Sequence, residues 1–88
     1  TDLYLITATA NITVSLPTAS AAYTGSRILF RRTAASVNTV SFNQTGALSR
    51  LMATGSVTLS AIINFPGATQ FSTEFVCDGT NWLQLYAT

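Results

Sequence analysis

Apolar side chains alternate with hydroxyl-bearing ones along most of the chain, and this pattern restricts the fold more than any other feature. Residues 12–16 read Ile-Thr-Val-Ser-Leu, and residues 39–42 read Thr-Val-Ser-Phe. Successive side chains of a strand point to opposite faces, so this alternation is typical of a strand with one buried face. The spacing of an amphipathic helix is not sustained in any window. The sequence therefore predicts an all-β protein.

Turn residues divide the alternating pattern into about eight short strands. Pro66-Gly67 is typical of a turn, and Asp78-Gly79 is a strong β-hairpin signal. We expect strands over residues 3–6, 12–16, 27–32, 39–42, 48–52, 57–59, 70–77 and 82–86. No internal repeat is evident. The prediction is an antiparallel β-sandwich with jelly-roll-like connections; a small barrel, or a stack of strands shared among three chains, also fits.

The chain is short, and few devices are available to stabilise it. Its 88 residues predict one domain, residues 1–88, with a modest core of its own. Cys77 is the single cysteine, so no intrachain disulfide can form, and the lack of histidine disfavours a zinc site. Partner subunits are the remaining source of stability. Because the chain does not start with Met and its last strand signal runs to Thr88, we expect a C-terminal fragment of a longer protein.

Charged residues make up 8% of the chain and lysine is absent, against about 25% charged residues in typical soluble domains. Subunit interfaces are depleted in lysine and glutamate, so this composition favours an oligomer. A monomer is the alternative, because threonine-rich surfaces are also common in β proteins. The net charge of +1 predicts no nucleic-acid partner, and no apolar run reaches the roughly 20 residues that a membrane span needs.

Few side chains could carry catalysis. With no histidine or lysine, the candidate bases are Asp2, Glu74 and Asp78. Glu74 and Asp78 would lie about 13 Å apart on a strand, which is too far for the paired carboxylates of a glycosidase. We therefore expect no enzymatic activity, no catalytic or metal-binding residues and no cofactor. Cys77 shares a strand face with aromatic residues, which predicts a buried thiol, with an interchain disulfide as the alternative.

Two arginines share a strand face with a leucine. Alternation places Arg27, Leu29 and Arg31 on one face of the strand over residues 27–32. This face could simply be solvated. Alternatively, the arginines could bridge to Glu74, Asp78 or a C-terminal carboxylate of a neighbouring subunit, because guanidinium groups pair bidentately with carboxylates. An anionic ligand is a third interpretation.

Aromatic residues near the C-terminus suggest a possible sugar site. Trp82 and Tyr86, with Tyr23 and Tyr4 from elsewhere in the chain, are candidates for stacking on sugar rings. Asn81 and Gln84 are the polar partners nearest to them in sequence. The candidate glycan contacts are Tyr23, Asn81, Trp82, Gln84 and Tyr86. The alternative is that Trp82 belongs to the core or to a subunit interface.

Two short motifs match the pattern for N-glycosylation. They are Asn11-Ile12-Thr13 and Asn43-Gln44-Thr45. Such motifs arise easily by chance in a threonine-rich chain, so the sequence does not decide whether either one carries a glycan.

Four segments occur in an order that resembles viral fibre-end domains. Residues 75–82, Phe-Val-Cys-Asp-Gly-Thr-Asn-Trp, resemble the terminal hairpin of many phage tail-fibre domains and of surface proteins of large algal viruses. Residues 11–17, 25–32 and 38–42 resemble the segments that precede that hairpin in such domains. The resemblance covers most of the chain and implies a virion-associated homotrimer at the end of a fibre or spike.

These observations lead to one expected function and one alternative. We expect a structural trimerisation domain of a viral fibre, spike or virion surface protein, with further copies of itself as its partner. The expected interface residues are Arg27, Leu29, Phe30, Arg31, Phe71, Phe75, Trp82 and Leu85. The alternative is a tip domain that binds a receptor or glycan on the host surface. The two functions are compatible, since a trimer multiplies weak sites by avidity.

Overall fold

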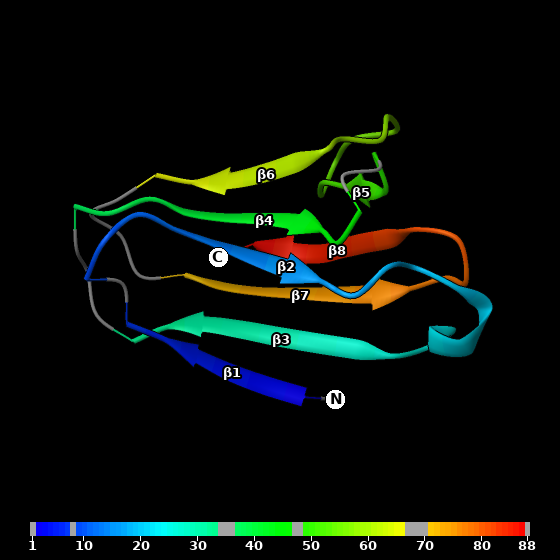
Figure 1. Cartoon of the computed structure of the whole chain (residues 1–88), viewed down its shortest axis with the longest axis horizontal. Helices are drawn as coiled ribbons and strands as arrows, with labels where there is room; N and C mark the ends of the chain where they lie inside the picture. The colour runs from blue at the N-terminus through cyan, green and yellow to red at the C-terminus, as the bar shows by residue number, and fades with distance from the viewer. Residues whose placement is uncertain (1, 8, 34–36, 47–48, 67–70, 88) are drawn as a thin grey trace.

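The chain folds into two β-sheets that face each other (Figure 1). The computed structural model describes residues 2–7, 9–33, 37–46, 49–66 and 71–87. The strands are β1 (Asp2–Ile6), β2 (Ile12–Leu16), β3 (Arg27–Arg32), β4 (Val40–Gln44), β5 (Leu51–Met52), β6 (Ile62–Phe65), β7 (Ser72–Cys77) and β8 (Trp82–Ala87), with a short 3-10 helix η1 (Ala21–Tyr23). The described residues include no α-helix. The predictions of an all-β chain and of eight strands are confirmed.

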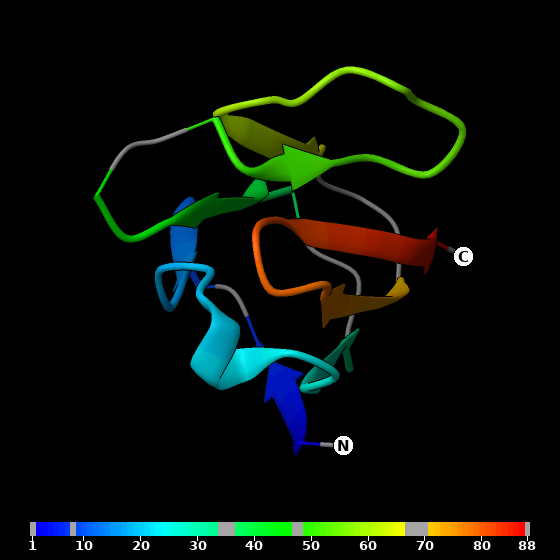
Figure 2. The same cartoon turned by 90° about the vertical axis from the view of Figure 1, so that its right-hand side faces the viewer.

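One sheet has five strands in the order β1-β3-β7-β8-β5, and the other has three in the order β2-β4-β6. From β1 to β7 the chain crosses to the opposite sheet after every strand (Figure 2). β1 and β3 pair in parallel, as do β2 and β4, whereas β4 and β6 pair antiparallel. The expected antiparallel sandwich is corrected to a mixed one, since three of the six strand pairings among the described residues are parallel. Jelly-roll connections need antiparallel neighbours, so these pairings do not follow that part of the expectation.

The first four strands form a structural repeat that was not evident in the sequence. In the first sheet Asp2 pairs with Ile28, 26 positions later, and in the second Ile12 pairs with Val40, 28 positions later. Both strand pairs therefore follow the same path through the two sheets.

Two strand expectations change in the middle of the chain. Residues 57–59 lie in a loop, and the strand of this region is β6, which begins at Ile62. Val57 is 90% exposed, so its alternation with Thr58 does not mark a buried face. The expected strand over residues 48–52 is reduced to β5 among the described residues. The predicted Pro66-Gly67 turn includes Gly67, which lies outside the described residues.

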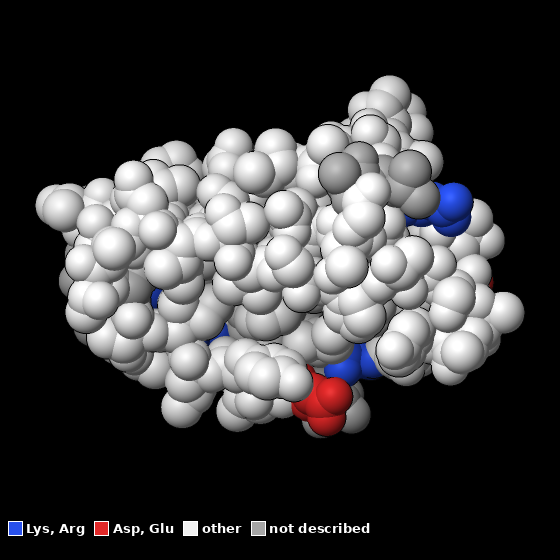
Figure 3. All heavy atoms as spheres, in the orientation of Figure 1, with Lys and Arg blue, Asp and Glu red and all other residues white. Residues whose placement is uncertain are grey.

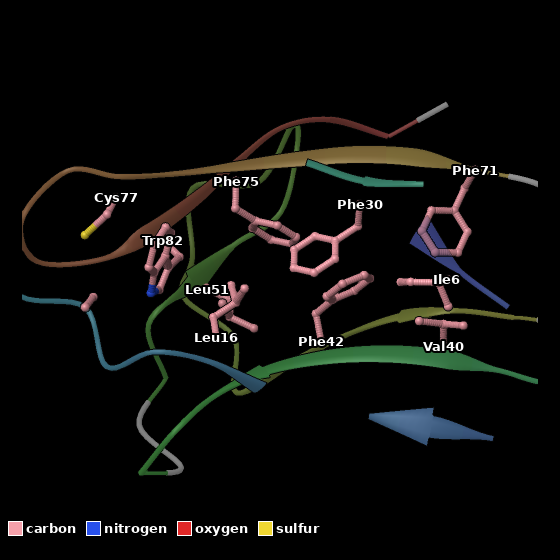
Figure 4. Packing of buried hydrophobic residues seen from close by; sticks show 11 residues of the cluster. Ile6, Leu16, Phe30, Val40, Phe42, Leu51, Phe71, Phe75, Cys77 and Trp82 are labelled. Carbon is pink, nitrogen blue, oxygen red and sulfur yellow. The ribbon is translucent and has the colours of Figure 1, made fainter. Parts of the chain in front are cut away.

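Aromatic side chains from both sheets fill the space between them (Figure 4). The Phe42 ring, from β4, lies 4.8 Å from the Phe30 ring and 5.4 Å from the Phe75 ring, both of which come from the five-stranded sheet. Phe65 and Phe71 stack on each other at 4.3 Å beside this group. Tilted and edge-on ring pairs of this kind contribute about 0.5–1.5 kcal/mol beyond the burial of their area.

Four residues that were expected at a subunit interface belong to this internal core. Phe30, Phe71, Phe75 and Trp82 are between 0% and 5% exposed in a single copy of the chain. Their side chains point into the space between the sheets, so in this fold they cannot contact another copy. The expectation is corrected for these four residues. Alternation in the sequence indicated that they are buried, but it could not show whether the core of the subunit or a neighbouring subunit buries them.

Trp82 anchors the end of the core nearest to the β7–β8 hairpin. Its indole Nε1–H donates a 2.7 Å hydrogen bond to the carbonyl oxygen of Pro17, which satisfies the polar atom of a fully buried ring. Cys77 lies in the same core and is 1% exposed, so the prediction of a buried thiol is confirmed. Its burial leaves no room for the alternative of an interchain disulfide.

One buried charge was not predicted. Arg32 is 0% exposed because it shares the inner face of β3 with Phe30, two positions earlier. Its Nη2 group donates to the carbonyl oxygen of Asn38. Gln44, at the end of β4, is also buried, and its side-chain oxygen accepts a 2.9 Å hydrogen bond from the Ala19 N–H. Polar side chains therefore close the two ends of a mostly aromatic core.

Phe42→Ala should destabilise the subunit by about 3–5 kcal/mol, because it removes a fully buried ring and leaves a cavity between the sheets. Chemical denaturation at one fixed protein concentration would measure the change. Val37→Ala is the control, since Val37 is 88% exposed and its truncation should alter stability by less than about 0.5 kcal/mol. Equal losses in the two variants would contradict this description of the core.

Candidate subunit interface on the five-stranded sheet

The outer face of the five-stranded sheet is mainly apolar. Strand pairing aligns outward-facing residues in rows across the sheet. One row consists of Leu3, Leu29, Glu74 and Tyr86. A neighbouring row consists of Arg27, Val76 and Leu83. These positions alternate with core residues such as Phe30 and Phe75, so their side chains point away from the other sheet. We call this surface the apolar face and define it by Leu3, Leu5, Leu29, Val76, Leu83 and Tyr86.

The apolar face is open to solvent in a single copy of the chain. Leu3 and Leu5 are 57% and 63% exposed, and the other four members are half-buried by their neighbours. Contiguous exposed apolar surface on a small domain commonly marks an interaction site. The geometry therefore offers a mainly apolar surface for another sheet or chain.

The outer face of the three-stranded sheet has the opposite character. Ser15 and Asn43 are joined across β2 and β4 by a 2.7 Å hydrogen bond, and Ser41 and Asn64 across β4 and β6 by one of 2.6 Å. Thr13 lies in the row of Ser41 and Asn64, and Ile62 is an exposed apolar residue on this face. Hydroxyl and amide groups hydrogen-bond to one another and to water, so this face is compatible with exposure to solvent.

Charge on the apolar face is confined to three side chains. The prediction that Arg27, Leu29 and Arg31 share a face is confirmed by the register of β3 against β7. The Arg27 guanidinium lies 4.0 Å from the Glu74 carboxylate within the same subunit, where their side chains are 52% and 12% exposed. Arg31 donates a 3.3 Å hydrogen bond to Ser72. Glu74 thus has a cationic neighbour within the chain, and any bridge to a second copy remains a proposal.

Leu85 differs from the rest of its strand. The register shifts at a β-bulge, where Phe75 pairs with Gln84 and Glu74 pairs with Tyr86, so Leu85 has no opposite residue. It is 40% exposed. Of the eight expected interface residues, Arg27, Leu29, Arg31 and Leu85 are accessible at the surface of the subunit. The members of the apolar face that sequence reasoning missed, such as Val76 and Leu83, alternate with core residues of their strands, and this spacing could have identified them.

The structure places the candidate glycan contacts in different surroundings. Trp82 is fully buried, and Gln84 is 9% exposed, with its amide donating to Thr73 at 2.9 Å. Tyr86 lies on the apolar face opposite Glu74, whereas Tyr23 lies on η1 and is 42% exposed. Asn81 lies in the β7–β8 turn. A sugar-stacking platform centred on Trp82 is therefore excluded by the burial of its ring.

The β7–β8 hairpin forms where the Asp78-Gly79 signal predicted it. The Asp78 carboxylate accepts hydrogen bonds from the Asn81 N–H at 2.7 Å and the Thr80 N–H at 2.8 Å, which fixes the four-residue turn. Gly79 has a φ angle of 99°, in the left-handed region that favours glycine. The two backbone donors stabilise the ionised carboxylate, so they hold the pKa of Asp78 below its ordinary value of 3.8.

The two glycosylation motifs have different surroundings. Asn11 is exposed ahead of β2, and its side-chain oxygen accepts a 2.8 Å hydrogen bond from the Thr39 N–H. Asn43 lies within the central strand of its sheet, half-buried and bonded to Ser15. Of the two, Asn11 therefore has the more accessible side chain.

The structure was also compared with what metal binding, membrane insertion and known families would require. In the part of the chain that is described, no three histidine, cysteine, aspartate or glutamate side chains gather where they could hold a metal ion. None of the described segments forms a helix with the length and hydrophobicity needed to cross a membrane. Comparisons with known proteins match the chain to no family model, no curated protein and no solved structure.

Replacing Asp78 should reveal a pH-dependent contribution to stability. The pKa of Asp78 is lower in the folded state than its ordinary value of 3.8. The difference in the free energy of unfolding between wild type and Asp78→Ala should therefore be largest above pH 3.8 and should decrease as the pH falls through the pKa of the folded state. Thermal unfolding between about pH 2 and pH 6 would measure it. Asp78→Asn is the control, since its amide oxygen can accept the same bonds but does not titrate. A stability difference between wild type and Asp78→Ala that stays constant over this pH range would contradict the lowered pKa of Asp78.

Proposed function

We propose that this chain is a trimerisation domain of a viral fibre, spike or other virion surface protein, located at the virion surface and partnered by two further copies of itself. The observation that carries the proposal is the apolar face. One sheet exposes leucine, valine and tyrosine outward, whereas the other exposes threonine and hydrogen-bonded pairs of serine and asparagine. A subunit with one apolar and one polar outer face is suited to an assembly in which the first is covered and the second is solvated.

The composition supports the same proposal. Only 8% of the residues are charged, and in Figure 3, which views the molecule from the side of the three-stranded sheet, the charged side chains form small separate groups. Burial of a large apolar side chain contributes about 1.5–3 kcal/mol, so covering several partly exposed leucines would add substantially to the stability of a small domain. Of the three charged residues of this face, Arg27 and Glu74 already pair with each other within the subunit, which lowers the cost of covering those two.

The number of subunits and the viral setting come from the resemblance of four sequence segments to fibre-end domains. The hairpin that carries the most specific of those segments, residues 75–82, is formed by β7 and β8. A fibre-end domain must align three chains, and a subunit that gains stability on assembly is suited to that task. The alternative of a glycan-binding tip has less support, because Trp82, its central aromatic residue, is buried.

The solution mass of the chain, measured by sedimentation across a dilution series, tests the proposal. We expect a mass near three times 9.3 kDa that persists on dilution. A monomer at every concentration would overturn the proposal.

A pair of matched variants tests which face is covered. Leu83→Lys places a charge on the apolar face and should shift the wild-type oligomer to monomer, because an unpaired buried charge strongly opposes association. Thr13→Lys places the same charge on the outer face of the three-stranded sheet and should leave the mass unchanged. Circular dichroism would verify that both variants remain folded. Dissociation of Thr13→Lys, with Leu83→Lys intact, would point to the polar face instead.

A further inference from the structure

Asn11 combines a glycosylation motif with an accessible side chain. An N-linked glycan is carried on the side-chain amide of asparagine in the pattern Asn-X-Ser/Thr, which Asn11-Ile12-Thr13 matches. Asn11 and Thr13 are both exposed, whereas Ile12 is half-buried and packs against the core. The two residues that define the motif therefore lie at the surface of the folded chain.

The hydrogen bond of the Asn11 side chain leaves its nitrogen available. The Thr39 main-chain N–H is a donor, so the Asn11 atom that it contacts at 2.8 Å is the oxygen Oδ1. This contact fixes the orientation of the amide. The Asn11 Nδ2 group, which would carry the glycan, has no hydrogen-bond partner among the described residues. In the same part of the chain, the Thr13 hydroxyl has none either.

Asn11 also lies at an open edge of its sheet. It directly precedes β2, which is the edge strand of the three-stranded sheet (Figure 1). A glycan is bulky and needs space on at least one side of its asparagine. Among the described strands β2 has β4 as its one neighbour in the sheet, so the other side of Asn11 is not occupied by a strand. Asn11 also belongs to the layer opposite the apolar face, which a glycan at this position would leave free.

The second motif, Asn43-Gln44-Thr45, has less space around it. Asn43 is half-buried in β4, which lies between β2 and β6, and its side-chain oxygen accepts the 2.7 Å hydrogen bond from Ser15. Gln44 is 1% exposed, and the Thr45 N–H donates to the Leu16 carbonyl oxygen at 2.8 Å. A bulky group on Asn43 would therefore have a strand on both sides.

We propose that Asn11 is the acceptor of an N-linked glycan and that Asn43 is not modified. The proposal does not depend on the proposed trimer, because Asn11 is exposed in a single copy of the chain. A glycan on Asn11 would add hydrophilic bulk to a chain in which only 8% of the residues are charged.

The modification is a group transfer to the Asn11 side chain. Its Nδ2 atom attacks C1 of the first sugar of an oligosaccharide carried on a lipid pyrophosphate. A bond between Nδ2 and C1 forms, the bond between C1 and the pyrophosphate oxygen breaks, and the lipid pyrophosphate leaves with the electron pair of that bond. One proton of the amide passes to a base of the transferase. The product is compatible with the folded chain because the space around Asn11 is open.

Production of the chain in cultured mammalian cells, behind a cleavable secretion leader, tests the proposal, because these cells supply the transferase and the lipid-linked oligosaccharide. Intact mass would be measured before and after treatment with a peptide-N-glycosidase, on secreted and on cell-retained protein. We expect one glycan on wild type and on Asn43→Gln, and none on Asn11→Gln. Thr13→Ala should also lose the glycan although Asn11 is unchanged, whereas the matched variant Thr13→Ser keeps the motif and should retain it.

The outcomes separate the glycan site from the proposed function. A glycan mapped to Asn11 alone supports the proposal. A wild-type chain without a glycan in either fraction, or with occupancy of Asn43 as high as that of Asn11, overturns it. Sedimentation of the same glycosylated protein gives the independent result: a monomer that carries the glycan on Asn11 would overturn the trimer and support the glycan site, and an unmodified trimer would do the reverse.

Discussion

Packing of aromatic rings between the two sheets is the interaction on which the rest of the structure depends. Phe42 from the smaller sheet contacts Phe30 and Phe75 from the larger one, and these rings set which face of each strand points inward. Once those faces are fixed, alternation leaves Leu29 and Leu83 outside the larger sheet. The apolar face is therefore a direct consequence of how the core is filled.

The outer faces of the two sheets differ in chemistry. Pairs such as Ser15 and Asn43 satisfy each other on the smaller sheet. The larger sheet has leucine and valine at the corresponding outward positions, and its charged side chains are Arg31 and the pair formed by Arg27 and Glu74. Covering this face with further copies would supply the burial that 88 residues without a disulfide do not provide by themselves. Assembly and stability are thus linked in the proposed function.

Alternation in the sequence predicted the local structure but not the partners of each strand. It identified most strands, the shared face of Arg27, Leu29 and Arg31, and the hairpin at Asp78, because these follow from periodicity and turn chemistry. It could not reveal the parallel pairing of β1 with β3, since a strand has the same pattern whichever neighbour it joins. Nor could it separate Trp82, buried within the subunit, from an aromatic residue buried between subunits.

The central claim is that the apolar face is covered by other copies in solution. Methyl NMR with a soluble paramagnetic probe tests this directly, because relaxation enhancement reports the exposure of each methyl group. We predict weak enhancement for the methyl groups of Leu3 and Leu5, which are 57% and 63% exposed in a single copy, and strong enhancement for those of Val37, which is 88% exposed. Enhancement of Leu3 and Leu5 in proportion to these exposed fractions would show that the face is solvated and would contradict the proposed assembly.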